Sequence, residues 1–92
     1  MSGTTRTLQI VNVKGLHARA SAKFVGAVAA LPDGTQVTVA KDGVEAGGGS
    51  ILGLMMLGAA QGDEIEIAVS GPDAEVTLMR LVGLVKDRFG ED

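Results

Sequence analysis

The sequence contains no cysteine, tryptophan or tyrosine, and its only aromatic residues are Phe24 and Phe89. Without cysteine the chain can form no disulfide bond, no thiolate nucleophile and no cysteine-ligated zinc site. With so few aromatic rings it lacks the stacking surfaces on which proteins bind single-stranded nucleic acid. One histidine, His17, is too few for a multi-histidine metal site. We therefore expect no metal, no cofactor and no nucleic-acid partner.

Long apolar runs are also missing. A membrane-spanning helix needs roughly 18 or more apolar residues, whereas the longest candidate, residues 51–60, is interrupted by Gly53 and Gly58. Residues 1–6 lack the charged-then-apolar order of a secretory signal. We therefore expect a cytoplasmic protein without membrane insertion. The chain has 92 residues, 46% of them hydrophobic, so we expect one core, one domain over residues 1–92 and a monomer.

The charged residues are unevenly distributed along the chain. Residues 1–32 contain four basic residues and no acidic one, and the remaining sixty contain four basic and eleven acidic residues. The formal charges of the two parts are therefore +4 and −7, which sum to the net charge of −3. Four basic residues without aromatic neighbours do not make a surface for a nucleic-acid duplex. They favour a small anion or an acidic protein as the partner.

Alternating apolar and polar residues predict four strands, and three other segments carry helical patterns. The predicted strands cover residues 7–13, 36–39, 44–46 and 64–69. The first helix begins at Ala18, ends before Pro32 and has one apolar side, made of Ala20, Phe24, Val28 and Leu31. A short second helix is capped by Ser50 and runs to about residue 57. The third opens at residues 70–73, and its apolar stripe consists of Leu78, Leu81, Val82, Val85 and Phe89.

The order of these elements is β-α-β-β-α-β-α, and the strands are apolar on one side only. Strands of this kind form antiparallel sheets with one face packed on a core. The sequence therefore predicts an α+β fold, in which a four-stranded antiparallel sheet carries three helices on one face.

His17 lies between a glycine turn and the start of the first helix, in the segment GLHAR of residues 15–19. A helix N-terminus presents unpaired N–H groups and partial positive charge, which together attract anions. Arg19 can add planar donors for phosphate oxygens. Because imidazole is largely neutral at pH 7, one ring nitrogen is free to attack phosphorus. On spacing alone, however, a histidine that merely caps the helix or packs at its start is the simpler interpretation.

Ser50 follows three glycines, in the segment GGGS of residues 47–50. The lysine of a phosphate-binding P-loop is missing, so a flexible strand exit followed by a serine N-cap is the simpler interpretation. Ser50 is nevertheless well placed for phosphorylation, because a phosphate at an N-cap gains from the helix dipole.

Residues 51–57, ILGLMML, are apolar on every side of the predicted short helix. If Leu54 and Leu57 face the core, then Ile51, Leu52 and Met55 point outward and form a docking site for a partner. The alternative is that the whole segment is buried.

Two segments together resemble the histidine-containing phosphocarrier family, HPr, of the bacterial phosphotransferase system. They are residues 15–25, GLHARASAKFV, and residues 50–58, SILGLMMLG. The chain length and the order of elements are also similar to those of the family, so the resemblance covers essentially the whole chain. It favours the phosphoryl-acceptor interpretation of His17 over the capping one.

The resemblance implies an open-faced β-sandwich and a carrier protein that is not itself an enzyme. His17 would be phosphorylated on Nδ1 by enzyme I and would pass the group to a IIA protein or domain. Arg19 corresponds to the family arginine beside the phosphohistidine. Ser50 falls where many members carry a serine modified by a dedicated kinase/phosphatase. Residues Ile51, Leu52 and Met55 fall on the family's docking patch for its partners.

The sequence departs from the family pattern at Ala20, where a proline usually follows the active-site arginine. Alanine frees the backbone angle φ and restores an N–H group at the helix start. The form HARAS is similar to that of proteobacterial members of a regulatory, nitrogen-related branch, so a role in sugar uptake and a regulatory role both stay open. The alternative from another class is a small interaction module that is never phosphorylated and binds through Ile51, Leu52 and Met55.

Overall fold

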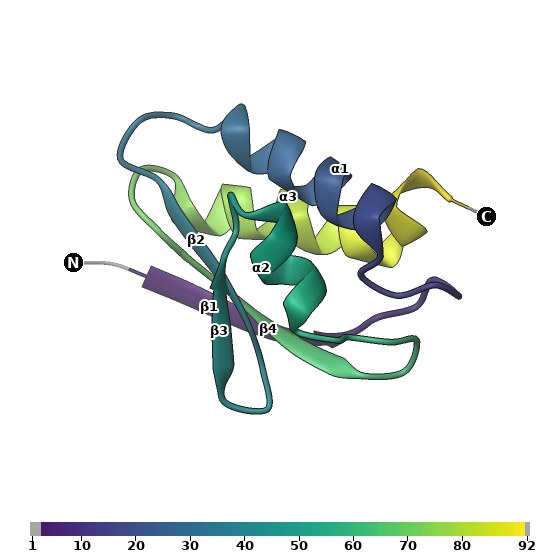
Figure 1. The fold of residues 1–92 in the computed structure, drawn as a ribbon. Helices are drawn as coiled ribbons and strands as arrows, with labels where there is room; N and C mark the ends of the chain where they lie inside the picture. The colour runs from purple at the N-terminus through teal and green to yellow at the C-terminus, as the bar shows by residue number, and fades with distance from the viewer. Residues whose placement is uncertain (1–2, 92) are drawn as a thin grey trace.

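The computed structural model describes residues 3–91, so residues 1, 2 and 92 of the expected domain lie outside the described part. Its strands form one four-stranded antiparallel sheet in the order β1-β4-β2-β3. The helices lie on one face of this sheet (Figure 1), and this arrangement confirms the predicted open-faced architecture. The elements in chain order are β1 (Gly3–Gln9), α1 (Ala18–Ala29), β2 (Gln36–Lys41), β3 (Val44–Gly47), α2 (Ile51–Met56), β4 (Glu64–Ser70), α3 (Ala74–Lys86) and the 3-10 turn η1 (Arg88–Gly90).

Strand β4 is central, and its length determines where the strand beside it, β1, ends. It pairs with β1 from Gly3 opposite Ser70 to Gln9 opposite Glu64. The prediction of a first strand over residues 7–13 was therefore wrong at both ends, because β1 extends only as far as β4 offers a partner. Beyond it, Ile10 still donates its N–H to the carbonyl of Asp63 at 2.9 Å and stays buried.

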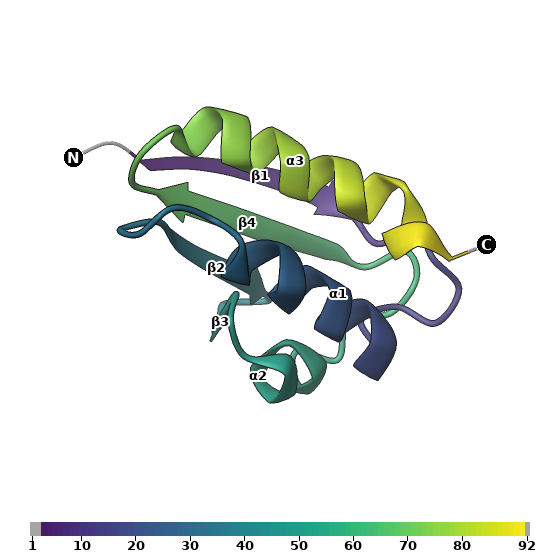
Figure 2. The same ribbon diagram turned by 90° about the horizontal axis from the view of Figure 1, so that it is seen from above.

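The core lies between the sheet and the helices α1 and α3, which run across it (Figure 2). The inward residues of β4 are buried, as their alternation predicted, and so is the apolar stripe of α3. Phe89 belongs to this core but not to the helix as predicted, because the chain leaves helical geometry after Asp87 and Phe89 itself has a φ of 55°. Among residues 3–91 no helix has both the length and the apolar character needed to cross a membrane.

A backbone contact at Gly15 fixes the segment that leads into α1. The N–H of Leu16 donates to the carbonyl of Ala59 at 2.9 Å, and the buried side chain of Asn12 donates to the carbonyl of Gly15 at 2.8 Å. Gly15 has a φ of 63°, a conformation that costs other residues strain. A Cβ atom there would lie 2.3 Å from the carbonyl oxygen of Ala59. The loop after β1 and the loop after α2 can therefore approach this closely only with glycine at residue 15.

We expect Gly15→Ala to lower the free energy of unfolding by at least about 2 kcal/mol, since it adds both strain and a backbone clash. Gly26→Ala is the matched control, because Gly26 is an exposed residue of α1 around which a Cβ atom would meet no other atom. The control should be stabilised by up to about 1 kcal/mol. Urea denaturation of both variants measures the difference, and equal effects would contradict the role of Gly15.

Candidate functional site

His17 is the N-cap residue of α1, and its ring is held at the helix start. The backbone N–H of Arg19 donates to Nδ1 of His17 at 3.3 Å. The first backbone bond of the helix runs from the Ser21 N–H to the His17 carbonyl at 2.9 Å. The capping role considered from the sequence is thus present, and it fixes the direction of the ring while 22% of the side chain stays exposed.

The first turn of α1 is well anchored beneath the ring. The hydroxyl of Ser21 donates to the carbonyl of Leu16 at 3.2 Å, and Ser21 itself is fully buried. Ala20, which replaces the proline of the family pattern, has no exposed surface. The N–H groups of residues 18–20 precede the helical ladder and carry the positive end of the helix dipole. A rigid helix start therefore presents donors beside Nδ1.

Glu91 completes the site, although no pattern in the sequence predicted it. Its Oε2 atom lies 2.8 Å from Nε2 of His17 and 3.7 Å from Nε of Arg19. Asn12 donates from Nδ2 to the other carboxylate oxygen, Oε1, at 3.3 Å. The contact with His17 is short but lacks the alignment of a good hydrogen bond, so its attraction is mainly electrostatic. Glu91 is far from His17 in the sequence. The turn after α3, in which Phe89 is buried, places Glu91 beside the start of α1.

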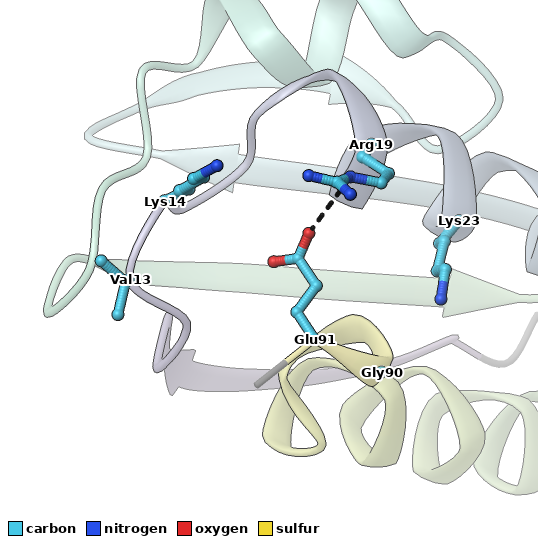
Figure 3. Close-up of a pocket in the computed structure, with 6 residues that line it drawn as sticks. All are labelled: Val13, Lys14, Arg19, Lys23, Gly90 and Glu91. Carbon is cyan, nitrogen blue, oxygen red and sulfur yellow. Dashed lines mark ion pairs between the residues drawn. The ribbon is translucent and has the colours of Figure 1, made fainter.

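A hollow of about 410 Å³ lies beside this cluster (Figure 3). Lys14, Arg19 and Lys23 bring three positive charges to it, and Glu91 is its one carboxylate among the lining residues. Three of the four basic residues of segment 1–32 are therefore gathered in one place. Among residues 3–91 no group of three or more His, Cys, Asp or Glu side chains could hold a metal ion. The chemistry available here is thus that of a nucleophilic nitrogen beside cations and helix N–H groups.

Ser50 and the apolar residues after it lie on α2, which packs beside α1 (Figure 2). Ser50 is exposed and caps α2, since its Oγ accepts a hydrogen bond from the Gly53 N–H at 2.9 Å. Leu54 and Leu57 are buried, whereas the predicted outward residues are exposed, as is Met56, which the sequence analysis did not name. The exposed fractions are 41% for Ile51, 68% for Leu52, 40% for Met55 and 76% for Met56. The alternative of a wholly buried segment was therefore wrong.

The pKa of Glu91 is lowered from its ordinary value of 4.5, and the largest cause is its contact with the His17 side chain. The electrostatic effects of His17 and Arg19 and the contact with Asn12 act in the same direction, against the desolvation of the carboxylate. Because the pKa is lower in the folded protein, ionised Glu91 stabilises the fold above pH 4.5. That contribution is lost as the pH falls through the lowered pKa.

We expect His17→Ala to raise the pKa of Glu91 toward its ordinary value, because the substitution removes the largest cause of the shift. Arg19→Ala should raise it less, since Arg19 is the smallest cause. A carbon-13 NMR titration of the Glu91 carboxyl group measures both. A larger rise in the Arg19 variant would contradict this description of the site.

Comparisons with known proteins agree with the geometry. The family model described as the phosphorylation site of the HPr component of the phosphotransferase system matches residues 4–87. The phosphocarrier protein HPr of Neisseria meningitidis is 40% identical over 86 residues, which are 94% of this chain and 94% of that protein. The corresponding protein of Cupriavidus necator is 37% identical, with the same two shares covered.

Solved structures have the same fold. The crystal structure of HPr-C-His from Thermoanaerobacter tengcongensis has a TM-score of 0.88 at 36% identity, and the match covers 97% of this chain and 98% of that one. The phosphocarrier protein HPr from Bacillus anthracis has a TM-score of 0.85 at 30% identity, covering 92% and 99% of the two chains. With a family model and whole-length relatives in agreement, the chain belongs to the HPr family of phosphocarrier proteins.

Proposed function

We propose that this protein accepts a phosphoryl group from phosphorylated enzyme I on Nδ1 of His17 and passes it to a IIA protein or domain. The observation that carries the proposal is the position of Nδ1, which acts as a hydrogen-bond acceptor beside the first N–H groups of α1. Membership of the phosphocarrier family supports it.

The transfer step exchanges one bond to phosphorus for another. The lone pair of Nδ1 forms the new N–P bond, while the bond from phosphorus to the donor breaks and the donor group keeps that electron pair. The Nε2 proton stays on the ring. The Arg19 N–H, which Nδ1 releases on forming the bond, can then donate to a phosphoryl oxygen, and the positive end of the α1 dipole stabilises the added negative charge.

Arg19 is the side chain that we assign to the phosphoryl group itself. Its side chain is 68% exposed, and its guanidinium makes a loose ion pair with Glu91, with 3.7 Å between Nε and Oε2. An exposed guanidinium with one loose ion pair can turn toward a dianionic phosphoryl group, with which it forms stronger, charge-assisted hydrogen bonds.

The exposed face of α2 is the surface that we assign to partner docking. Ile51, Leu52 and Met55 offer apolar contact area next to the helix that carries His17. Ser50 adjoins this patch with its hydroxyl at the surface, where a kinase/phosphatase of the HPr type could add or remove a phosphate. Phosphorylation of Ser50 would then regulate docking.

We expect His17→Ala to abolish phosphorylation by enzyme I and phosphoenolpyruvate while leaving the fold intact, because the side chain lies at the surface and outside the core. Arg19→Ala is the comparison variant, which keeps the nucleophile and should react roughly 10- to 100-fold more slowly. Mass spectrometry detects the added phosphoryl group and its lability in acid. Acid-labile phosphorylation that persists without His17 would refute the assignment, and a wild-type protein that gains no mass would favour the interaction module.

We expect Ser50→Asp to slow phosphorylation of His17 by enzyme I roughly 10-fold or more, because a charge beside the apolar patch opposes its desolvation. Ser50→Asn is the matched control, since asparagine caps a helix as well as aspartate does and carries no charge. We expect the wild type and both variants to have similar melting temperatures. Only the Asp variant should have a lower initial rate of phosphorylation. Equal rates for the two variants would mean that Ser50 serves only as the cap of α2.

A further inference from the structure

The His17 ring has a different neighbour at each nitrogen: a hydrogen-bond donor at Nδ1 and an acceptor at Nε2. The Arg19 backbone N–H points at Nδ1 from 3.3 Å, and the Glu91 carboxylate faces Nε2 from 2.8 Å. Both Nε2 and Oε2 are almost entirely shielded from water. The carboxylate, and not water, is therefore the neighbour of Nε2.

A neutral imidazole carries its proton on one nitrogen only. A proton on Nδ1 would face the N–H of Arg19, and the lone pair of Nε2 would then face a carboxylate oxygen at 2.8 Å. Both contacts would be repulsive. A proton on Nε2 makes both attractive, so the surroundings select the form with a free lone pair on Nδ1.

We propose that Glu91 is a positioning residue for phosphoryl transfer, which holds the His17 ring with its proton on Nε2 and its nucleophilic lone pair on Nδ1. This inference rests on the proposed function. As the Nδ1 lone pair bonds to phosphorus, the ring gains positive charge, and the carboxylate beside Nε2 stabilises that charge without taking the proton.

Contacts on two sides position Glu91 beside the ring. Asn12 is fully buried and divides its Nδ2 donors between the carbonyl of Gly15 and Oε1 of Glu91. On the other side, the buried Phe89 anchors the turn that precedes Glu91. Asn12, which holds the Gly15 turn before His17, therefore also orients the carboxylate of Glu91. The other charged groups around the site, Lys14, Arg19 and Lys23, are cations, and Arg19 helps to keep the carboxylate ionised.

The test measures the ring tautomer by nitrogen-15 NMR on the unphosphorylated protein at about pH 9, where imidazole is neutral. In the wild-type protein we expect only the form protonated on Nε2. In Glu91→Ala the form protonated on Nδ1 should rise toward the fraction that free histidine shows in water. Glu91→Gln should lie between the wild type and Glu91→Ala, since an amide oxygen still favours a proton on Nε2 but carries no charge. Glu66→Ala, which removes an exposed carboxylate of β4, is the matched control and should resemble the wild type.

Phosphorylation by enzyme I then separates positioning from packing. We expect Glu91→Ala to react roughly 10-fold more slowly, with part of the phosphoryl group on Nε2, and Glu91→Gln to lie between Glu91→Ala and the wild type in both rate and product. Phosphorus-31 NMR distinguishes the two phosphohistidines. A wild-type tautomer in Glu91→Ala, or an unchanged rate and product despite a changed tautomer, would overturn the inference. A wild-type protein that accepts no phosphoryl group would overturn the proposed function instead, and the tautomer measurement needs no enzyme I.

Discussion

The hydrogen bond from the Leu16 N–H to the Ala59 carbonyl is the constraint on which the site depends. It joins the segment after β1 to the segment after α2, and the absence of a side chain at Gly15 permits it. Because of this bond, the start of α1 and the end of α2 are fixed relative to each other before any side chain is considered. His17 and the exposed apolar face of α2 thus share one backbone frame.

Within this frame, charged groups of opposite sign meet at the His17 ring. The segment that carries His17 is basic, and a carboxylate from the acidic part of the chain is inserted into it at Glu91. Charged and polar groups that a fold has already oriented need little rearrangement when charge moves during a reaction. This is the main advantage of a folded site over the same groups in water. The cost is the desolvation of Glu91, which its contacts with His17 and Asn12 offset.

Local patterns in the sequence predicted the parts of the structure that local forces determine. The alternation in β4, the start of α1 at Ala18 and the start of α2 after Ser50 follow from side-chain periodicity and from helix caps. The end of β1 depends on how far β4 extends beside it, and the site of Glu91 depends on a turn at Phe89 with positive φ. Neither leaves a periodic signal, because both arise from contacts between residues far apart in the chain.

The central place of β4 has a consequence for the order in which the fold can form. Strand β4 is the last strand in the sequence, yet it lies between β1 and β2 and pairs with both. While the chain emerges from a ribosome, the hairpin of β2 and β3 can close early, but β1 has no partner until residue 70 is available. The edges of β1 and β2 that β4 will cover stay open during that interval, and such edges can pair with other chains. Closure over so long a stretch also slows folding, so the arrangement that brings the site together exposes the nascent chain to misassembly.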